Sequence, residues 1–252
     1  MTQWHIDLIL YKAYAELRGE ITRHYLGFAW WLIEPVMYMA AFYLVFGVVF
    51  ERSSEHFVAF LLVGLVVWKW FDVGVRQSMS AIDRHSGLIS QVYIPKYLFP
   101  LITVASVTIK FSIIFSILVV FLLFYGVEVT RYWLLLPGVI LLQLLFLSAC
   151  AMVVAAWVPL LGDIRPVIEN GMMMLFFLSG IFFDIGQLNE PLKSLFELNP
   201  MTWFLAAFRL ILIDGVAPSL SGLTWVLSFT LLFGVIGLLS LRHFDKIYPK
   251  VL

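Results

Sequence analysis

The sequence has little charge and a single cysteine. Charged residues make up 13% of its 252 positions and hydrophobic residues 62%, and the 16 basic residues balance the 16 acidic ones. A soluble globule of this size has too small an interior for so much apolar side chain, and a disordered chain would be polar and highly charged. A net charge of zero argues against a general nucleic-acid binder, and Cys150 alone excludes a disulfide framework and a multi-cysteine metal site. A polytopic membrane protein remains.

The sequence also lacks the motifs of several enzyme classes. None of its seven lysines follows a glycine, so it has no P-loop to hold the phosphates of ATP. It has no HExxH, no CxxC and no paired-aspartate cluster of the kind that a metal-dependent prenyl transferase has. Its five histidines lie outside the apolar stretches and far apart in the sequence. We therefore predict no catalytic residue, no metal site and no cofactor bound by this chain.

Six apolar stretches reach or approach the length of about 20 residues that a helix needs to cross the hydrocarbon core. They are Leu26–Phe50, Phe57–Met79, Leu98–Tyr125, Tyr132–Leu161, Val167–Phe183 and Leu223–Leu241. The runs are continuous rather than alternating, which favours helices over strands. The expected fold is all-α, a polytopic membrane protein with six transmembrane helices, an N-terminal amphipathic interface helix and a re-entrant outer helical hairpin.

The N-terminal residues 1–24 favour an amphipathic helix. Charged residues from Asp7 to Glu20 interrupt any apolar signal-peptide core. Apolar side chains recur at helical spacing along one side of this segment, and Lys12 and Glu16 lie off that side. The apolar positions are Trp4, Leu8, Tyr11 and Ala15. Such a helix lies flat on a membrane surface, and the alternative is an ordinary helix packed on the bundle.

The loop charges predict the orientation. With six spans, ten Lys and Arg fall on one side and four on the other, which places both termini in the cytoplasm. The segment Asp184–Gly222 is then outside, and its apolar run Met201–Ile213 is too short to span. Turn residues flank this run, so we expect a short helical hairpin that dips back toward the membrane. The chain is read as one transmembrane domain, 1–252, with five spans in 26–183, the outer hairpin in 185–222, the sixth span in 223–241 and a cytoplasmic tail in 242–252.

Polar groups within the apolar stretches are candidates for function, because charge in the bilayer is costly. Trp30, Glu34 and Tyr38 share one helix face, and aromatic rings beside a carboxylate suit a sugar. The alternative is an ion pair between Glu34 and Lys110 or Lys69. A second set, Lys69, Asp72 and Arg76, can form one network on a helix face, either stabilising or functional.

Aromatic residues make up 17% of the chain. Several of them cluster near two span ends, where an aromatic-lined pore would let a polymer slide because stacking tolerates shifts of register. These are Trp68, Trp70, Phe71, Phe176, Phe177, Phe182 and Phe183. The competing interpretation is that these side chains face lipid or pack in the bundle.

Four segments carry a family resemblance in their order and spacing. They are Tyr25-Leu26-Gly27-Phe28-Ala29-Trp30 with Glu34-Pro35; Gly64-Leu65-Val66-Val67-Trp68-Lys69-Trp70-Phe71; Gly87-Leu88-Ile89 with Val92-Tyr93-Ile94-Pro95-Lys96 and Pro100; and Asn199-Pro200-Met201-Thr202 with Phe208-Arg209 and Asp214-Gly215. From about residue 20 to 215 the chain resembles the permease subunit of a type 2 ABC exporter of polysaccharides, namely O antigen, capsule or teichoic acid.

The resemblance implies a function and a set of partners. The permease would form a homodimer with a pore between its copies, and two copies of a separate ATPase subunit would bind ATP and Mg²⁺. The cargo would be a polyprenyl-linked polysaccharide, O antigen first, in a bacterial inner membrane whose lipid surrounds the chain. A coupling helix would lie in 81–96, and a plain connecting loop is the alternative there. The ATPase contact candidates are Asp83, Arg84, His85, Leu88 and Ile89.

Two further sites follow from the same resemblance. The outer hairpin would be a gate, with Asn199, Pro200, Trp203 and Arg209 as its candidate residues. A lipid pyrophosphate would meet the positive side chains of Arg18, Arg23 or Arg84 at its cytoplasmic entrance. Other classes stay open: an ion-coupled secondary transporter that uses Glu34, Lys69 and Asp72, an enzyme of lipid-linked sugar metabolism, and a small-molecule exporter.

Overall fold

The computed structural model describes residues 3–23, 57–89 and 91–248, with a few single positions between 29 and 44, and the side chains of residues 3, 4, 6 and 20–23 lie outside the description. All regular structure in these ranges is helical. Four helical segments are long and apolar enough to cross a membrane: α3 (Phe57–Ser78), α5 (Leu98–Phe124), η3 (Arg131–Leu135) continued by α6 (Leu136–Trp157), and α10 (Leu220–His243). The chain is therefore a multi-pass membrane protein.

These helices confirm four of the six expected spans, the second, third, fourth and sixth. The first, Leu26–Phe50, lies outside the described ranges. The fifth differs from its prediction, because α7 (Ile164–Phe177) has 14 residues and ends six positions before Phe183. At 1.5 Å per residue it is about 21 Å long, short of the roughly 30 Å core. Gly180, with φ of 71°, turns the chain at the point where the hydropathy of the sequence suggested a continuing helix.

Helix α3 lies at the centre of the described bundle. It packs against α5, α6, α7 and α9. Of the residues in its most apolar 18-residue stretch, 72% are buried, against 28% for α5 and 11% for α10. Helix α10 packs chiefly along α6, with its other side outward. A central helix meets protein on most sides, which explains how the second span can carry Lys69, Asp72 and Arg76.

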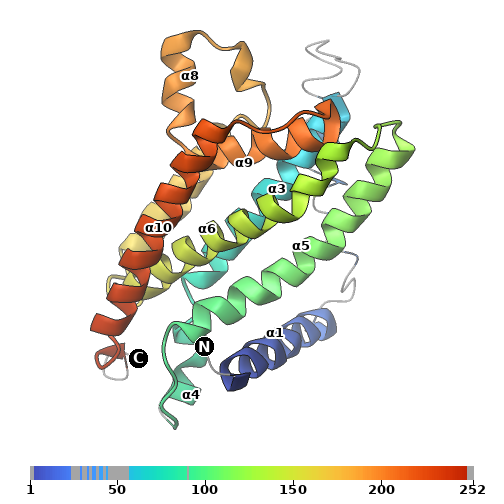
Figure 1. Ribbon diagram of the computed structural model, residues 1–252. Coiled ribbons are helices and arrows are strands. Elements are labelled where there is room, and N and C mark those ends of the chain that lie inside the picture. Colours follow the sequence, from blue (N-terminus) through green and yellow to red (C-terminus); the bar gives the residue numbers. More distant parts are fainter. Residues whose placement is uncertain are drawn as a thin grey trace.

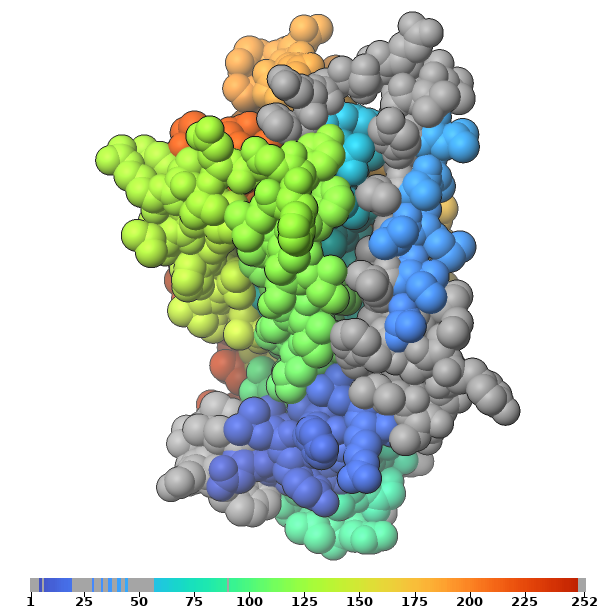
Figure 2. Space-filling view, turned by 90° about the vertical axis from the view of Figure 1, so that its right-hand side faces the viewer, coloured from blue at the N-terminus to red at the C-terminus, as the bar shows by residue number. Residues whose placement is uncertain are grey.

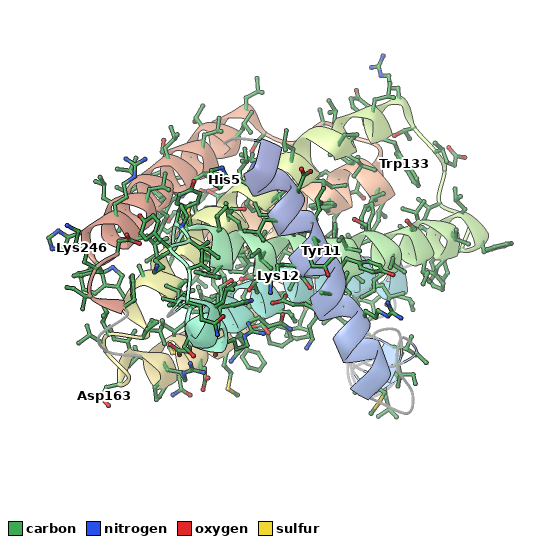
Figure 3. All side chains as sticks on the ribbon, turned by 90° about the horizontal axis from the view of Figure 1, so that it is seen from below. His5, Tyr11, Lys12, Trp133, Asp163 and Lys246 are labelled. Carbon is green, nitrogen blue, oxygen red and sulfur yellow. The ribbon has the colours of Figure 1, made fainter. Side chains whose placement is uncertain are left out.

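The predicted N-terminal helix is present as α1 (Gln3–Arg23), which crosses beneath the bundle and packs on α5 (Figures 1 and 3). Its inner side contributes Ala13 and Leu17, which are buried. Tyr11, from the expected apolar side, is 71% exposed, as are large parts of Leu10 and Tyr14. The helix thus packs on the bundle with one side, as one alternative drawn from the sequence has it, and exposes an aromatic side. Its position on a membrane surface stays a prediction.

The outer segment folds into η4 (Ile185–Gln187), α8 (Glu190–Glu197), α9 (Pro200–Arg209) and η5 (Leu210–Asp214). The α8 axis makes an angle of 100° with the continuous helix α9–η5. Gly215, in the left-handed conformation, ends that helix. The helical pair agrees with the expected hairpin, and its re-entry into the membrane stays a prediction.

The two ends of the bundle carry different parts of the chain. Helix α1, the short η2 (Asp83–His85) with α4 (Ser86–Ile89), and the end of α10 lie at one end, while α8 and α9 lie at the other (Figure 1). The space-filling view shows α1 as a band across the first end, below α5 and beside the region of α4 (Figure 2). The expected coupling and gate segments are therefore at opposite ends.

Candidate functional site

An aromatic cluster joins α3 to α7 and the turn that follows it. The Trp68 ring centroid lies 5.9 Å from that of Phe71 and 5.8 Å from that of Phe176. Phe176 in turn lies 5.2 Å from both Phe177 and Phe182. Trp68, Phe71 and Phe182 are buried, whereas Phe177 is 50% exposed. Five of the expected path residues are thus in one cluster, and Phe177 is its open edge.

Trp70 lies apart from this cluster. Its ring stacks on Phe111 of α5 at 3.9 Å with an interplanar angle of 10°, and its indole N–H donates to Thr108 Oγ1 at 3.2 Å. Residues three apart on a helix share a face and residues two apart do not. Trp68 therefore contacts Phe176 of α7 and Phe71 stacks on Phe146 of α6, while Trp70 points to α5. Within one copy of the chain, Trp70 is a packing residue of the bundle.

Of the remaining candidates for the polymer path, one contacts α8 and the others lie outside the residues that the structure describes. Phe183 packs edge to face on Phe196 of α8, with ring centroids 5.5 Å apart. Trp30, Glu34 and Tyr38 lie outside the described residues, so the sugar-binding face proposed for them stays a prediction.

Arg209 binds three backbone carbonyls from two distant segments. Its Nη1 donates to Gly180 O and its Nη2 to Ile181 O, each at 2.7 Å, and its Nε donates to Phe60 O at 3.1 Å. The guanidinium also lies over the Phe60 ring, 3.4 Å from its centroid, and Arg209 is 7% exposed. A Cβ on Gly64 would overlap Nη2. The predicted gate residue is therefore a clamp between α3 and the turn after α7, and glycine at 64 leaves room for it.

Asn199 holds the same turn from the start of α9. Its Oδ1 accepts from the backbone N–H of Met201 at 3.0 Å and caps the helix, and its Nδ2 donates to Ser179 Oγ at 2.8 Å. Pro200 occupies the first turn, where a missing N–H removes no helical bond. Asn199 and Arg209, one at each end of α9, thus fix the turn at Ser179–Ile181.

Trp203, the last gate candidate, connects the hairpin to α10. Its indole N–H donates to Ser219 O at 3.2 Å, and a Cβ on Gly222 would overlap its ring. Trp225 of α10 donates in the opposite direction, to Leu198 O at 3.3 Å. These paired tryptophan bonds make the hairpin and the outer end of α10 one unit.

Two charged groups of α3 pair with each other and reach α7. Arg76 Nε donates to Asp72 Oδ1 at 2.7 Å, and its Nη2 donates to Glu169 O of α7 at 3.2 Å. The expected pairing is present for Asp72 and Arg76, and it ties α3 to α7, as a stabilising network would. Lys110 is 8% exposed, and its expected alternative partner Glu34 lies outside the described residues.

The segment expected to contact an ATPase is helical in η2 and α4, rather than a plain loop. Asp83 Oδ2 lies 3.7 Å from Arg165 Nη2 at the start of α7, and the same Nη2 donates to Ser80 Oγ at 3.1 Å. Burial raises the pKa of the Asp83 carboxyl, and Arg165 and Arg84 counteract this in part. Ile89 is 6% exposed and anchors α4 in the core, so it does not face outward from this copy.

His85 connects this segment to α1. Its Nδ1 lies 2.8 Å from Ala81 O and so carries a proton that it donates, and its ring stacks on Phe99 with centroids 5.0 Å apart. Its Nε2 faces Glu16 Oε1 of α1 at 3.8 Å. The His85 ring therefore joins η2 to both α5 and α1.

The third connection runs to the end of α10, and our sequence analysis missed it. The Tyr93 hydroxyl donates to Asp245 Oδ2 at 2.9 Å, and Lys96 Nζ lies 3.8 Å from Asp245 Oδ1. The bond to Asp245 raises the pKa of Tyr93, because it holds the neutral phenol against a carboxylate. Tyr93 is also 73% exposed, more accessible than the candidates on α4.

The expected pyrophosphate entrance is only partly described. Arg84 donates to Gln77 O and, at 3.4 Å, to Ser80 O, so its guanidinium serves carbonyls at the end of α3 while remaining exposed. Arg18 is exposed on α1, and the side chain of Arg23 lies outside the description. A role for these arginines in binding pyrophosphate stays a prediction.

Comparisons with known proteins place most of the chain in one family. The family model described as ABC-2 type transporter matches residues 13–213. The O-antigen export system permease protein RfbA of Myxococcus xanthus is 27% identical over 213 residues, covering 84% of this chain and 82% of its own. A Klebsiella pneumoniae protein of the same name is 21% identical over 210 residues, covering 83% and 81%. The polysialic acid transport protein KpsM of Escherichia coli is 25% identical over 240 residues, covering 90% and 89%.

Proposed function

Because this chain belongs to the ABC-2 type transporter family, we propose that it is the membrane subunit of an ATP-driven exporter of a lipid-linked polysaccharide, O antigen first. The observation that carries the proposal is the similarity to polysaccharide permeases over more than four fifths of both chains. Two of these three relatives are O-antigen permeases, which favours O antigen over capsular polysaccharide or teichoic acid.

The partners follow from what the sequence lacks. The chain has no P-loop, so a separate ATPase must supply the energy. We propose that two ATPase subunits bind a homodimer of this chain in the bacterial inner membrane, at the end where η2, α4 and both described chain ends lie. That end is then cytoplasmic, as the ten-to-four distribution of loop Lys and Arg predicts.

The contacts of the coupling segment support a route for the ATPase motion. The segment meets α7 through Asp83 and Arg165, α1 through His85 and Glu16, and the end of α10 through Tyr93 and Asp245. A push on the segment 81–96 would therefore act on α7, on α1 and on the end of the chain that follows α10. Because α7 carries Phe176 and Phe177, such a motion would reach the aromatic cluster directly.

The polysaccharide would advance along the aromatic cluster toward the outer hairpin. Phe177, the exposed member, would face a pore between two copies, where rings stack on the apolar faces of sugars. The clamp of Arg209 and the Asn199 contact hold the turn that follows, so they set the position of the gate.

Co-expression with a candidate ABC ATPase subunit tests the proposal. We expect a stable two-plus-two complex by light scattering, and ATP hydrolysis that a polyprenyl-pyrophosphate glycan stimulates. A chain that binds no ATPase, yet moves solute when an ion gradient is applied, would refute it. That result would transfer attention to Lys69 and Asp72 as ion-coupling groups.

Replacing Phe177 with alanine should lower export while leaving the amount of membrane-inserted chain unchanged. The loss of one stacked ring is worth about 1 kcal/mol, or about fivefold in rate. Phe124→Ala is the matched control, because Phe124 is 88% exposed at the far end of α5, away from the cluster. Surface polysaccharide is the readout. An equal loss in both variants would contradict a specific role for Phe177.

Exchanging the charges of Asp83 and Arg165 separates coupling from stability. Asp83→Arg would set three positive charges together with Arg84 and Arg165, and we expect glycan-stimulated ATP hydrolysis to fall. Adding Arg165→Asp restores opposite charges and should recover part of the activity. Thermal stability should change by less than about 1 kcal/mol, since exposed ion pairs contribute little. No recovery in the exchanged pair would argue against this contact as a coupling route.

A further inference from the structure

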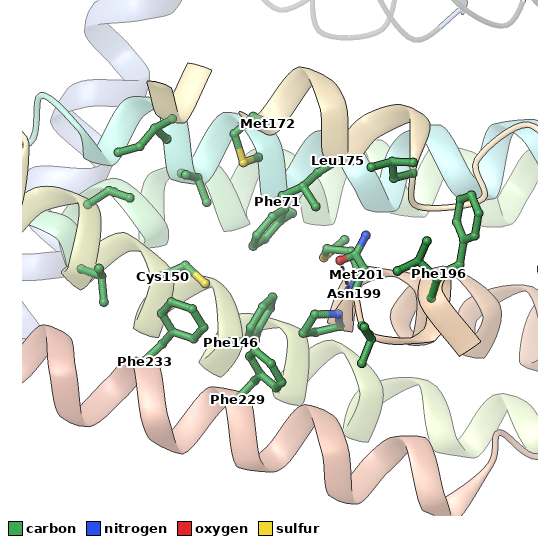
Figure 4. A pocket seen from close by; sticks show the side chains of 18 residues that line it. Phe71, Phe146, Cys150, Met172, Leu175, Phe196, Asn199, Met201, Phe229 and Phe233 are labelled. Atoms are coloured by element: carbon green, nitrogen blue, oxygen red, sulfur yellow. Dashed lines mark hydrogen bonds between the residues drawn. The ribbon is translucent and has the colours of Figure 1, made fainter. Parts of the chain in front are cut away.

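A cavity of about 550 Å³ lies between the spans and the outer hairpin. Phe71 of α3 and Met172 of α7 line one side, and Phe146 of α6 with Phe229 of α10 lines the other (Figure 4). Asn199 and Phe196, both from the hairpin, lie toward one end of the cavity. Its volume falls in the range of about 300–1,000 Å³ typical of sites for small ligands.

The cavity offers a ligand almost nothing but hydrocarbon. Among its lining residues, Cys150 has a thiol and Asn199 an amide, and the others have apolar side chains. The Asn199 amide is already engaged, since its oxygen accepts from Met201 N and its nitrogen donates to Ser179 Oγ. Water needs two to four polar partners in such a space, and apolar cavities stay dry and take up apolar ligands. The occupant must therefore be apolar.

The exposed fractions of the lining residues indicate where such an occupant would enter. Phe71, Phe146 and Met201, on the inner walls, are at most 4% exposed. Leu178, Leu195 and Leu198, near the outer hairpin, are 45%, 61% and 56% exposed. The lining on α7 and its C-cap runs from Ile168 to Leu178, ten residue steps or about 15 Å at helical rise. The cavity is thus an elongated slot along α7, open beneath α8.

We propose that this slot holds one hydrocarbon chain of a membrane lipid, inserted beneath α8. The surroundings supply that chemistry, because a multi-pass protein is bathed in lipid chains. The walls come from α3, α6, α7, α8, α9 and α10. The lipid hydrocarbon chain would therefore contact elements on both sides of the turn that Arg209 holds. Two molecules could supply such a hydrocarbon chain: a phospholipid through its acyl chain, and an exported conjugate through its isoprenoid tail.

Photolabelling of the full-length chain in its membrane tests the site. One probe is a phosphatidylethanolamine with a diazirine in its acyl chain, and the other is a diazirine-bearing polyprenyl phosphate. After irradiation, peptides are mapped by mass spectrometry. We expect adducts on the cavity side of α7, near Met172, in addition to those on outward residues of α10 such as Leu231, which is 68% exposed. The probe that labels Met172 more strongly identifies the source.

Plugging the slot supplies the decisive comparison. Val154→Trp adds bulk to the lining from α6, and adducts near Met172 should fall at least several-fold while those at Leu231 persist. Leu232→Trp, at a 55% exposed position on α10, is the matched control and should leave both unchanged. If Val154→Trp does not fold, Met172→Trp fills the slot from α7, with adducts read at Phe229 and Phe233.

Labelling inside the slot that is the same with and without the plug would overturn the proposal, as would labelling confined to outward residues. Neither readout needs ATP, an ATPase or export. Failure here therefore leaves the proposed function standing, and failure of the ATPase experiment leaves the lipid site standing.

Discussion

Arg209→Leu is expected to lower the free energy of unfolding by roughly 3 kcal/mol or more, because it removes three charge-assisted hydrogen bonds and leaves buried carbonyls unpaired. The measurement is thermal unfolding in detergent, with the remaining folded protein quantified by size-exclusion chromatography. Arg131→Leu is the matched control, since Arg131 is exposed and, among the described residues, hydrogen-bonds to the neighbouring Tyr132. Its effect should stay within about 0.5 kcal/mol. Equal effects of the two substitutions would refute the clamp.

The clamp should also matter beyond stability. Gly180 and Ile181 precede Phe182 of the aromatic cluster, so releasing their carbonyls frees the turn that positions this ring. We expect the folded fraction of Arg209→Leu to export less than wild type. Arg209→Lys should be intermediate in stability, because a single ammonium keeps the charge but lacks the planar fork that reaches several carbonyls.

Gly64→Ala provides an independent test of the same contact. Its Cβ would overlap Nη2, so the substitution should destabilise the wild-type chain but cost little once Arg209 is leucine. Gly138→Ala, on α6 with nothing within 4 Å of its Cβ, is the control and should be neutral or stabilising. Additive effects of Gly64→Ala and Arg209→Leu would show that the two residues do not interact.

Local patterns in the sequence predicted the long helices well and the non-local contacts poorly. Continuous apolar runs located α3, α5, α6 and α10, and the four segments identified the family correctly. Hydropathy extended α7 to Phe183 because Ile181 and Phe182 are as apolar as a span, whereas the conformation of Gly180 decides where the helix ends. The sequence contains this glycine, but it does not reveal the backbone angle that the glycine adopts.

Two further points concern faces and partners. The sequence analysis grouped Trp70 with Trp68 and Phe71, whereas the helical period separates residues two apart and the Trp70 ring stacks on Phe111 of α5. A role for Trp70 in the polymer path stays a prediction. The contacts of Asp83 with Arg165 and of His85 with Glu16 join residues 82 and 69 positions apart. No spacing rule within a single sequence pairs such distant charges, since the fold alone brings them together.

The crossing of α6 and α10 should be sensitive to one added methyl group, because the clash there involves backbone atoms. A Cβ on Gly237 would lie 2.7 Å from Met152 Cβ, 3.0 Å from Val153 N and 3.1 Å from Met152 C. Two of these atoms belong to the α6 backbone and cannot rotate away, so Gly237→Ala must move one helix from the other. Overpacking of this kind costs about 1–3 kcal/mol, which exceeds the roughly 1 kcal/mol that alanine gains over glycine in a helix.

Gly234→Ala, one turn earlier on α10, is the matched control with the opposite expected sign. Its Cβ would lie 3.8 Å from Ala149 Cβ, an ordinary contact, so the helical preference of alanine should leave stability unchanged or raise it. Thermal unfolding of both variants in the same detergent measures the difference. Trimming Met152 to alanine should not rescue Gly237→Ala, because the Met152 Cβ and backbone remain. Rescue would mean that side-chain crowding, rather than the approach of two backbones, makes glycine necessary where the sixth span meets the fourth.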